Sequence, residues 1–123
     1  MHNLARRLLA VETARKSDAD ARMHEAVLVC EKLRISLTRF AGPDGFTSLL
    51  RRALVLARAQ APALNDLQIR PDGSLEGLAA IPDANESAIA IVAHLLTLLV
   101  TFIGRPLTLR LLREVWPDVS FDE

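Results

Sequence analysis

The stretch that decides the fold is Ala88–Gly104, AIAIVAHLLTLLVTFIG, in the last third of a 123-residue chain. It contains no charged residue and no proline, and its only polar side chains are His94, Thr97 and Thr101. The run is shorter than the ~20 apolar residues that a membrane-spanning helix needs, and its histidine lies near the middle. We therefore predict a central helix that the rest of the chain buries, and no association with a membrane.

Helix signals stand on both sides of this stretch. Asp83 can accept hydrogen bonds from the first free amides, and Glu86 completes a capping-box pattern three residues later. Gly104 followed by Pro106 is typical of a helix end and a new helix start. The central helix is thus predicted over about 84–103, and a last helix over about 106–116, whose single Trp116 we expect to close the core.

Apolar side chains also recur at helical spacing nearer the amino terminus. They predict a first helix over about 3–16, with Leu4 and Leu8 on its inner face. Ser17 and Asp20 supply a cap for a second helix over about 18–40, although one continuous helix is the alternative. The second helix is predicted from apolar residues three and four positions apart: Met23, Ala26, Cys30, Leu33, Leu37 and Phe40.

A helix stop and a change of periodicity follow. Gly42-Pro43 ends the second helix, and Asp44 is expected to cap a third helix over about 45–60. After it, apolar and polar residues alternate on both sides of Pro71-Asp72-Gly73, which is strong turn chemistry. This pattern predicts a small β-hairpin over about 67–78.

Together these elements predict a mainly all-α fold. It is a compact bundle of about five helices, roughly 3–16, 18–40, 45–60, 84–103 and 106–116, with one small β-hairpin at about 67–78. A chain of this length supports one hydrophobic core. We therefore treat 1–123 as a single helical domain, with 1–16 as an N-terminal helix that can be semi-independent and 117–123 as a loose acidic tail.

The composition argues against several classes of partner. Fifteen basic and fifteen acidic residues give a net charge of zero, so there is no long-range attraction to nucleic acid or anionic lipid and little repulsion between copies. The single cysteine, Cys30, excludes a disulfide within the chain and fits a reducing cytoplasm. We expect a cytoplasmic protein that binds neither nucleic acid nor a membrane.

The small and polar residues of the central helix all fall on one narrow stripe. They recur three and four residues apart, at Ser87, Ala90, His94, Thr97, Thr101 and Gly104. Such a stripe is either the side that meets water or a side that a second helix can approach closely. Because so apolar a helix has few partners within 123 residues, the hypothesis is that a second copy helps to bury it, with this stripe as the candidate interface.

No catalytic, metal-binding or cofactor-binding motif is recognisable. His24 lacks a second histidine at metal-ligand spacing, and no cofactor or small-molecule substrate is implied. His94 is the one candidate for chemistry. In length, helical content and a histidine on the central helix, the chain resembles histidine phosphotransfer domains. That family usually carries a Lys and a Gly three and four residues after the histidine, where this chain has Thr97 and Leu98.

A second alternative is a helix-turn-helix nucleic-acid binder. It would use Arg51, Arg52 and Arg58 on the third predicted helix, but DNA-binding domains usually concentrate a positive excess that this chain lacks. The main prediction is therefore a non-catalytic helical interaction or regulatory module that self-associates as a homodimer and can also bind another protein.

Overall fold

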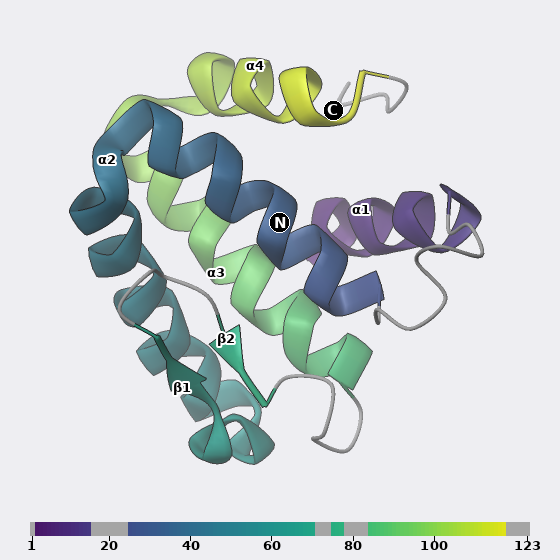
Figure 1. The fold of residues 1–123 in the computed structure, drawn as a ribbon, viewed down its shortest axis with the longest axis vertical. Coiled ribbons are helices and arrows are strands. Elements are labelled where there is room, and N and C mark those ends of the chain that lie inside the picture. The colour runs from purple at the N-terminus through teal and green to yellow at the C-terminus, as the bar shows by residue number, and fades with distance from the viewer. Residues whose placement is uncertain (1, 16–24, 71–74, 78–83, 118–123) are drawn as a thin grey trace.

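The apolar stretch forms helix α3, Ala84–Ile103, and the other helices pack around it (Figure 1). The computed structural model describes residues 2–15, 25–70, 75–77 and 84–117. Within these ranges the helices are α1 (His2–Arg15), α2 (Glu25–Gln60), α4 (Arg105–Val115) and a short 3₁₀ helix, Pro62–Asp66. The predicted all-α class is confirmed.

Helix α3 is covered by its own chain along most of its length. Every residue from Ser87 to Ala93 is buried, as are Leu95, Leu96, Leu98 and Leu99, and α3 contacts α1, α2 and α4. Among the described residues, Glu86–Ile103 is the helical stretch long and apolar enough to cross a membrane by length and composition alone, and 61% of it is buried inside the bundle. Helices of the same chain thus bury most of α3. The hypothesis from the sequence was that a second copy helps to bury it.

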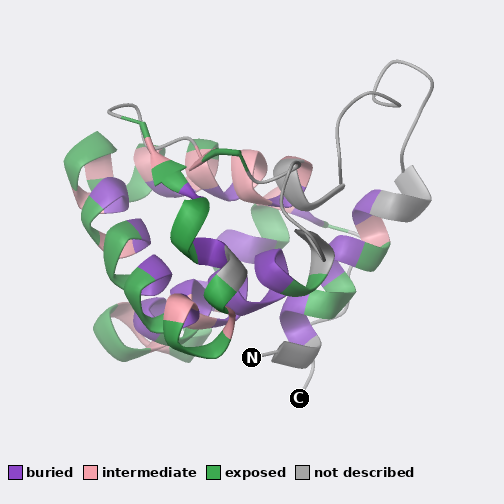
Figure 2. Ribbon diagram, turned by 90° about the horizontal axis from the view of Figure 1, so that it is seen from below, coloured by how far each residue is buried: buried purple, intermediate pink, exposed green. Residues whose placement is uncertain are grey.

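The core is aliphatic and draws on α1, α2, α3 and α4. Figure 2 shows the buried positions on the helix faces that turn toward one another. Phe46 and Trp116 are the largest side chains in this core, and Trp116 has no exposed surface. Tryptophan at the end of α4 therefore fixes this helix to the bundle, as expected.

Helix α2 consists of two helical segments that meet at Gly42. This residue has a φ of 84° and a ψ of 162°, which is not helical. The second segment begins at Pro43, where the ring presets φ for a first turn, and not at residue 45 as predicted. Asp44 was expected to cap this segment but lies inside the helix, because Gly42 takes the non-helical position. The predicted second and third helices are therefore the two segments of α2.

The junction between α3 and α4 repeats this geometry. Gly104 has a φ of 87° and a ψ of 158°, and α4 begins at Arg105, one residue before the predicted start. At each junction a buried threonine donates to the carbonyl oxygen four residues earlier, Thr47 to Pro43 and Thr108 to Gly104, both at 2.8 Å. Each glycine thus ends one helix and permits another to start in a new direction.

The predicted hairpin is present beside the helices (Figure 1). Strands β1 (Gln68–Ile69) and β2 (Leu75–Glu76) pair antiparallel, with Ile69 opposite Leu75. Leu67 is buried, and Ile69 and Leu75 pack against the core. The predicted turn at 71–73, the caps at Ser17, Asp20 and Asp83, and the tail from 118 onward lie outside the described residues.

Two predicted core positions are wrong, Phe40 and Leu56, the second of which is 39% exposed on the second segment of α2. Phe40 was expected at the end of the inward face of 18–40, but its side chain is 46% exposed. Leu33 and Leu37, from the same predicted face, are buried. Phe40 instead lines a surface hollow together with Leu107 and Leu111 of α4.

Candidate interaction surface

The residues of the α3 stripe are divided between the core and the surface. Ser87 and Ala90 are buried, His94 and Gly104 are half-buried, and Thr97 and Thr101 are exposed. The exposed hydroxyls donate within the helix, Thr97 to Ala93 and Thr101 to Thr97, at 2.9 Å each. A partner could therefore reach only the carboxyl-terminal half of the candidate interface.

His94 is held by the end of α2. Its Nε2 lies 3.1 Å from Oε1 of Gln60, the last residue of that helix. Phosphorylation of His94 at Nε2 would require this nitrogen to leave Gln60. Among the described residues, no group of three or more His, Cys, Asp or Glu side chains is placed to hold a metal ion.

The three arginines of the helix-turn-helix alternative differ in their surroundings. Arg58 donates from Nε to the Leu64 carbonyl oxygen at 3.3 Å and from Nη2 to that of Leu67 at 3.0 Å. Its guanidinium thus holds the 3₁₀ helix and the following residue against α2. Arg51 and Arg52 are exposed on the same helical segment.

A hollowed surface lies between the first segment of α2 and helix α4. Two adjoining hollows of about 290 and 280 Å³ share Ser36, Arg39 and Glu114 in their walls. We call this surface the α2–α4 groove. Its walls are Lys32, Ile35, Ser36, Arg39 and Phe40 from α2, and Leu107, Arg110, Leu111, Glu114 and Val115 from α4.

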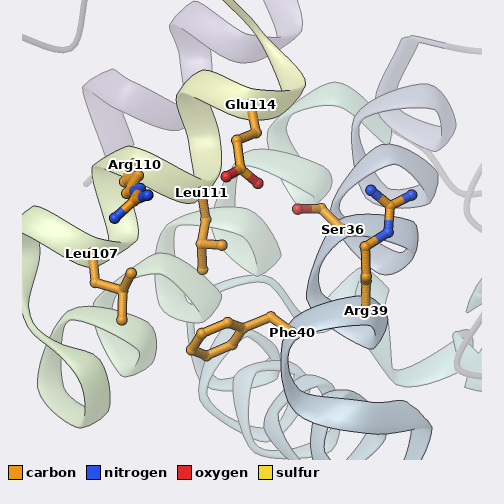
Figure 3. Close-up of a pocket in the computed structure, with 7 residues that line it drawn as sticks. All are labelled: Ser36, Arg39, Phe40, Leu107, Arg110, Leu111 and Glu114. Atoms are coloured by element: carbon orange, nitrogen blue, oxygen red, sulfur yellow. The ribbon is translucent and has the colours of Figure 1, made fainter.

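Apolar and charged side chains alternate across the α2–α4 groove. Figure 3 shows the Phe40 ring reaching from α2 toward Leu107 and Leu111 of α4. Ile35 and Phe40 are 53% and 46% exposed, which is high for large apolar side chains. The two hollows adjoin and are open to the surface, whereas small-molecule sites are usually clefts that bury most of the ligand. The groove therefore suits a helix or a peptide better than a small substrate.

Three charged side chains of the groove have no charged partner among the described residues. Within the part of the chain that the structure describes, Arg39, Arg110 and Glu114 make no salt bridge or side-chain hydrogen bond. Lys32 differs, because its Nζ contacts Glu12 Oε1 at 2.5 Å. Both signs of charge are thus available on this one surface.

A buried hydrogen-bonded junction holds the two walls of the groove. Glu12 of α1 is 2% exposed, and its Oε1 accepts from Lys32 of α2 and from Trp116 Nε1, 2.8 Å away at the end of α4. Sequence reasoning did not identify Glu12. The signal in the sequence was its position: Glu12 lies one turn after Leu8 and two turns after Leu4, on a helix face that is otherwise apolar.

Comparison with known proteins gives no family or relative. No protein-family model matches this chain, no curated protein matches it, and no solved structure matches it. The functional argument therefore rests on the surfaces themselves.

Proposed function

We propose that this protein is a non-catalytic helical interaction module of the cytoplasm that self-associates as a homodimer and acts as a regulatory or assembly component. The observation that carries the proposal is the α2–α4 groove. It combines exposed apolar side chains, Ile35 and Phe40, with charges of both signs that have no partner among the described residues. A surface with both signs can be complementary to a copy of itself.

The charge of the whole chain supports the same proposal. Fifteen basic residues balance fifteen acidic ones, so two copies do not repel each other at long range. Exposed apolar side chains gathered at one groove are typical of interaction sites, whereas single ones scattered over a surface are ordinary. Val55, Leu56 and Phe102 are also exposed, but none of them lines the groove.

Burial inside the bundle changes where the contact is expected. Because α1, α2 and α4 cover α3, and Ser87 and Ala90 are buried, the α3 stripe offers a second copy only Thr97 and Thr101 with the half-buried His94 and Gly104. The α2–α4 groove offers more apolar surface and more available charge. We therefore place the self-association there in the proposal.

Light scattering coupled to size-exclusion chromatography tests the proposal on the unmodified chain. At high concentration we expect a mass near twice the chain mass of 13.5 kDa, which falls toward 13.5 kDa on dilution. A mass of 13.5 kDa at every concentration, up to the limit of solubility, would contradict self-association.

A further inference from the structure

We infer that two copies meet through antiparallel α4 helices, each lying over the α2–α4 groove of the other, with Arg110 of one copy paired to Glu114 of the second copy. This inference rests on the proposed self-association and names its surface. The occupant of the groove is a second copy of this chain.

The spacing of the two charges on α4 carries the argument. Arg110 and Glu114 are four residues apart and line the same side of α4, about 6 Å apart along the helix axis at ~1.5 Å per residue. A two-fold axis perpendicular to α4, lying beside the helix and level with the midpoint between these two residues, places each arginine opposite the glutamate of the other copy. A parallel arrangement would instead place like charges opposite each other. Only the antiparallel pairing matches unlike charges at both positions.

The same two side chains are available for an intermolecular contact. Within a helix, an ion pair is less favourable when the arginine precedes the glutamate by four residues than in the reverse order. Arg110 and Glu114, both described by the structure, form no ion pair with each other. Both are exposed. Arg39 on the opposite wall adds a second cation within the same groove, so a carboxylate that enters from a second copy meets positive charge on both sides.

The apolar side chains of the groove fit the same arrangement. Ile35 and Phe40 are exposed on the α2 wall, and Leu107 and Val115 are half-buried on the α4 wall. A helix seated over the groove, at the usual interaxial distance of ~8–10 Å, contacts both walls. Helix α4 lies along one edge of the bundle (Figure 1), where a second copy can reach it.

Charge reversal at the two positions tests the inference. We expect Arg110→Glu and Glu114→Arg, each alone, to raise the dissociation constant of the dimer about tenfold or more, because both symmetric ion pairs are lost and like charges replace them. Arg113→Glu is the matched control: Arg113 is exposed on α4 but does not line the groove, and we expect no change. Circular dichroism of each variant checks that the bundle is folded.

The decisive experiment mixes the Arg110→Glu and Glu114→Arg variants. In a mixed dimer, the glutamate introduced by Arg110→Glu in one chain faces the arginine introduced by Glu114→Arg in the other, and the remaining pair is the native one. Native mass spectrometry should therefore show a heterodimer with close to the affinity of the unmodified dimer, and weak homodimers of either variant.

The possible failures are distinguishable. If the unmodified chain is monomeric, the proposed function itself is wrong. If the unmodified chain dimerises and both single variants dimerise equally well, the contact lies elsewhere, and only the inference is overturned. If the single variants lose the dimer but their mixture does not recover it, the Arg110–Glu114 pairing is wrong.

Discussion

At the scale of single residues, the buried carboxylate of Glu12 is the least expected feature. One oxygen accepts from side chains of two other parts of the bundle, Lys32 of α2 and Trp116 after α4. Buried polar groups in proteins are nearly always hydrogen-bonded, because leaving one unpaired is costly. Glu12 thus ties α1 to both walls of the α2–α4 groove.

Removal of this carboxylate should destabilise the whole bundle. We expect Glu12→Ala to lower the free energy of unfolding by about 2–3 kcal/mol, mostly because the buried Trp116 N–H loses its acceptor. Lys32 contributes less, since its side chain is 37% exposed and water can replace the carboxylate. Glu12→Gln keeps an acceptor and should lose less.

Urea unfolding followed by Trp116 fluorescence measures this loss. Glu76→Ala is the control, because the Arg70–Glu76 pair is 3.8 Å apart and both side chains are more than half exposed, so its removal should change stability by no more than ~0.5 kcal/mol. Equal stabilities for Glu12→Ala and the unmodified chain would show that the junction does not hold the bundle together.

The single thiol should be inert in the folded protein. Burial, with the neighbouring Glu31 carboxylate as the smaller cause, raises the pKa of Cys30 from 9.0 to about 12. Because the thiolate is the reactive form, we expect no reaction with Ellman's reagent at neutral pH until urea unfolds the chain. Rapid stoichiometric labelling of the folded protein would contradict this account.

The same shift predicts a loss of stability at alkaline pH. The folded pKa of Cys30 lies above the unfolded value, so the unfolded chain releases the thiol proton first as pH rises. The contribution of the protonated thiol is complete below about pH 9 and is lost as pH rises from 9.0 toward 12. A cysteine-free Cys30→Ala variant should show a smaller alkaline loss in urea titrations.

Burial of single residues was predicted correctly where the position on a helix face alone determines it. Leu4 and Leu8, and likewise Leu33 and Leu37, were placed inward from spacing alone and are buried. Phe40 was misplaced because it lies on the surface beside Leu107 and Leu111 of α4, a neighbourhood that local spacing does not predict. Glu12 was missed because its partner Trp116 is 104 residues away in the chain, beyond the reach of any local pattern.

At the scale of elements, two glycines define how the helices are joined. Gly42 and Gly104 have nearly the same φ and ψ, in a region that is essentially restricted to glycine. Gly-Pro chemistry made both breaks predictable. The residue at which each new helix begins was not predictable, because it depends on which residue takes the non-helical conformation.

Alanine at either junction should be destabilising. We expect Gly42→Ala and Gly104→Ala each to lower the free energy of unfolding by about 1–3 kcal/mol. At Gly42 the cost is conformational, since an added Cβ would meet no heavy atom within 4 Å. Thermal and urea unfolding measure the change, and unchanged stability at Gly42 would contradict the backbone argument.

Gly45→Ala is the comparison for Gly42. Gly45 does not have a positive φ, so alanine there gains up to about 1 kcal/mol of helix propensity. An added Cβ would approach Ala41 Cβ at 3.2 Å, which offsets part of that gain. The change at Gly45 should therefore be clearly smaller than the loss at Gly42.

At the scale of the whole molecule, the sequence predicted the class of fold better than the surface that results. The all-α bundle, the central helix and the hairpin follow from periodicity and turn chemistry. The α2–α4 groove does not, because residues 32–40 and 107–115 are far apart in the chain and meet only through tertiary packing. The residues of the α3 stripe recur at helical spacing, but tertiary packing decides that Ser87 and Ala90 are inside.

The most direct test of self-association through the α2–α4 groove is the concentration dependence of backbone amide chemical shifts in the unmodified, ¹⁵N-labelled protein. We predict that dilution moves the signals of residues 32–40 and 107–115 together, along one binding curve, and leaves those of 51–59 unchanged. Shifts that stay constant at all concentrations, or that change at 97–102 while both walls of the groove remain unaffected, would contradict the account.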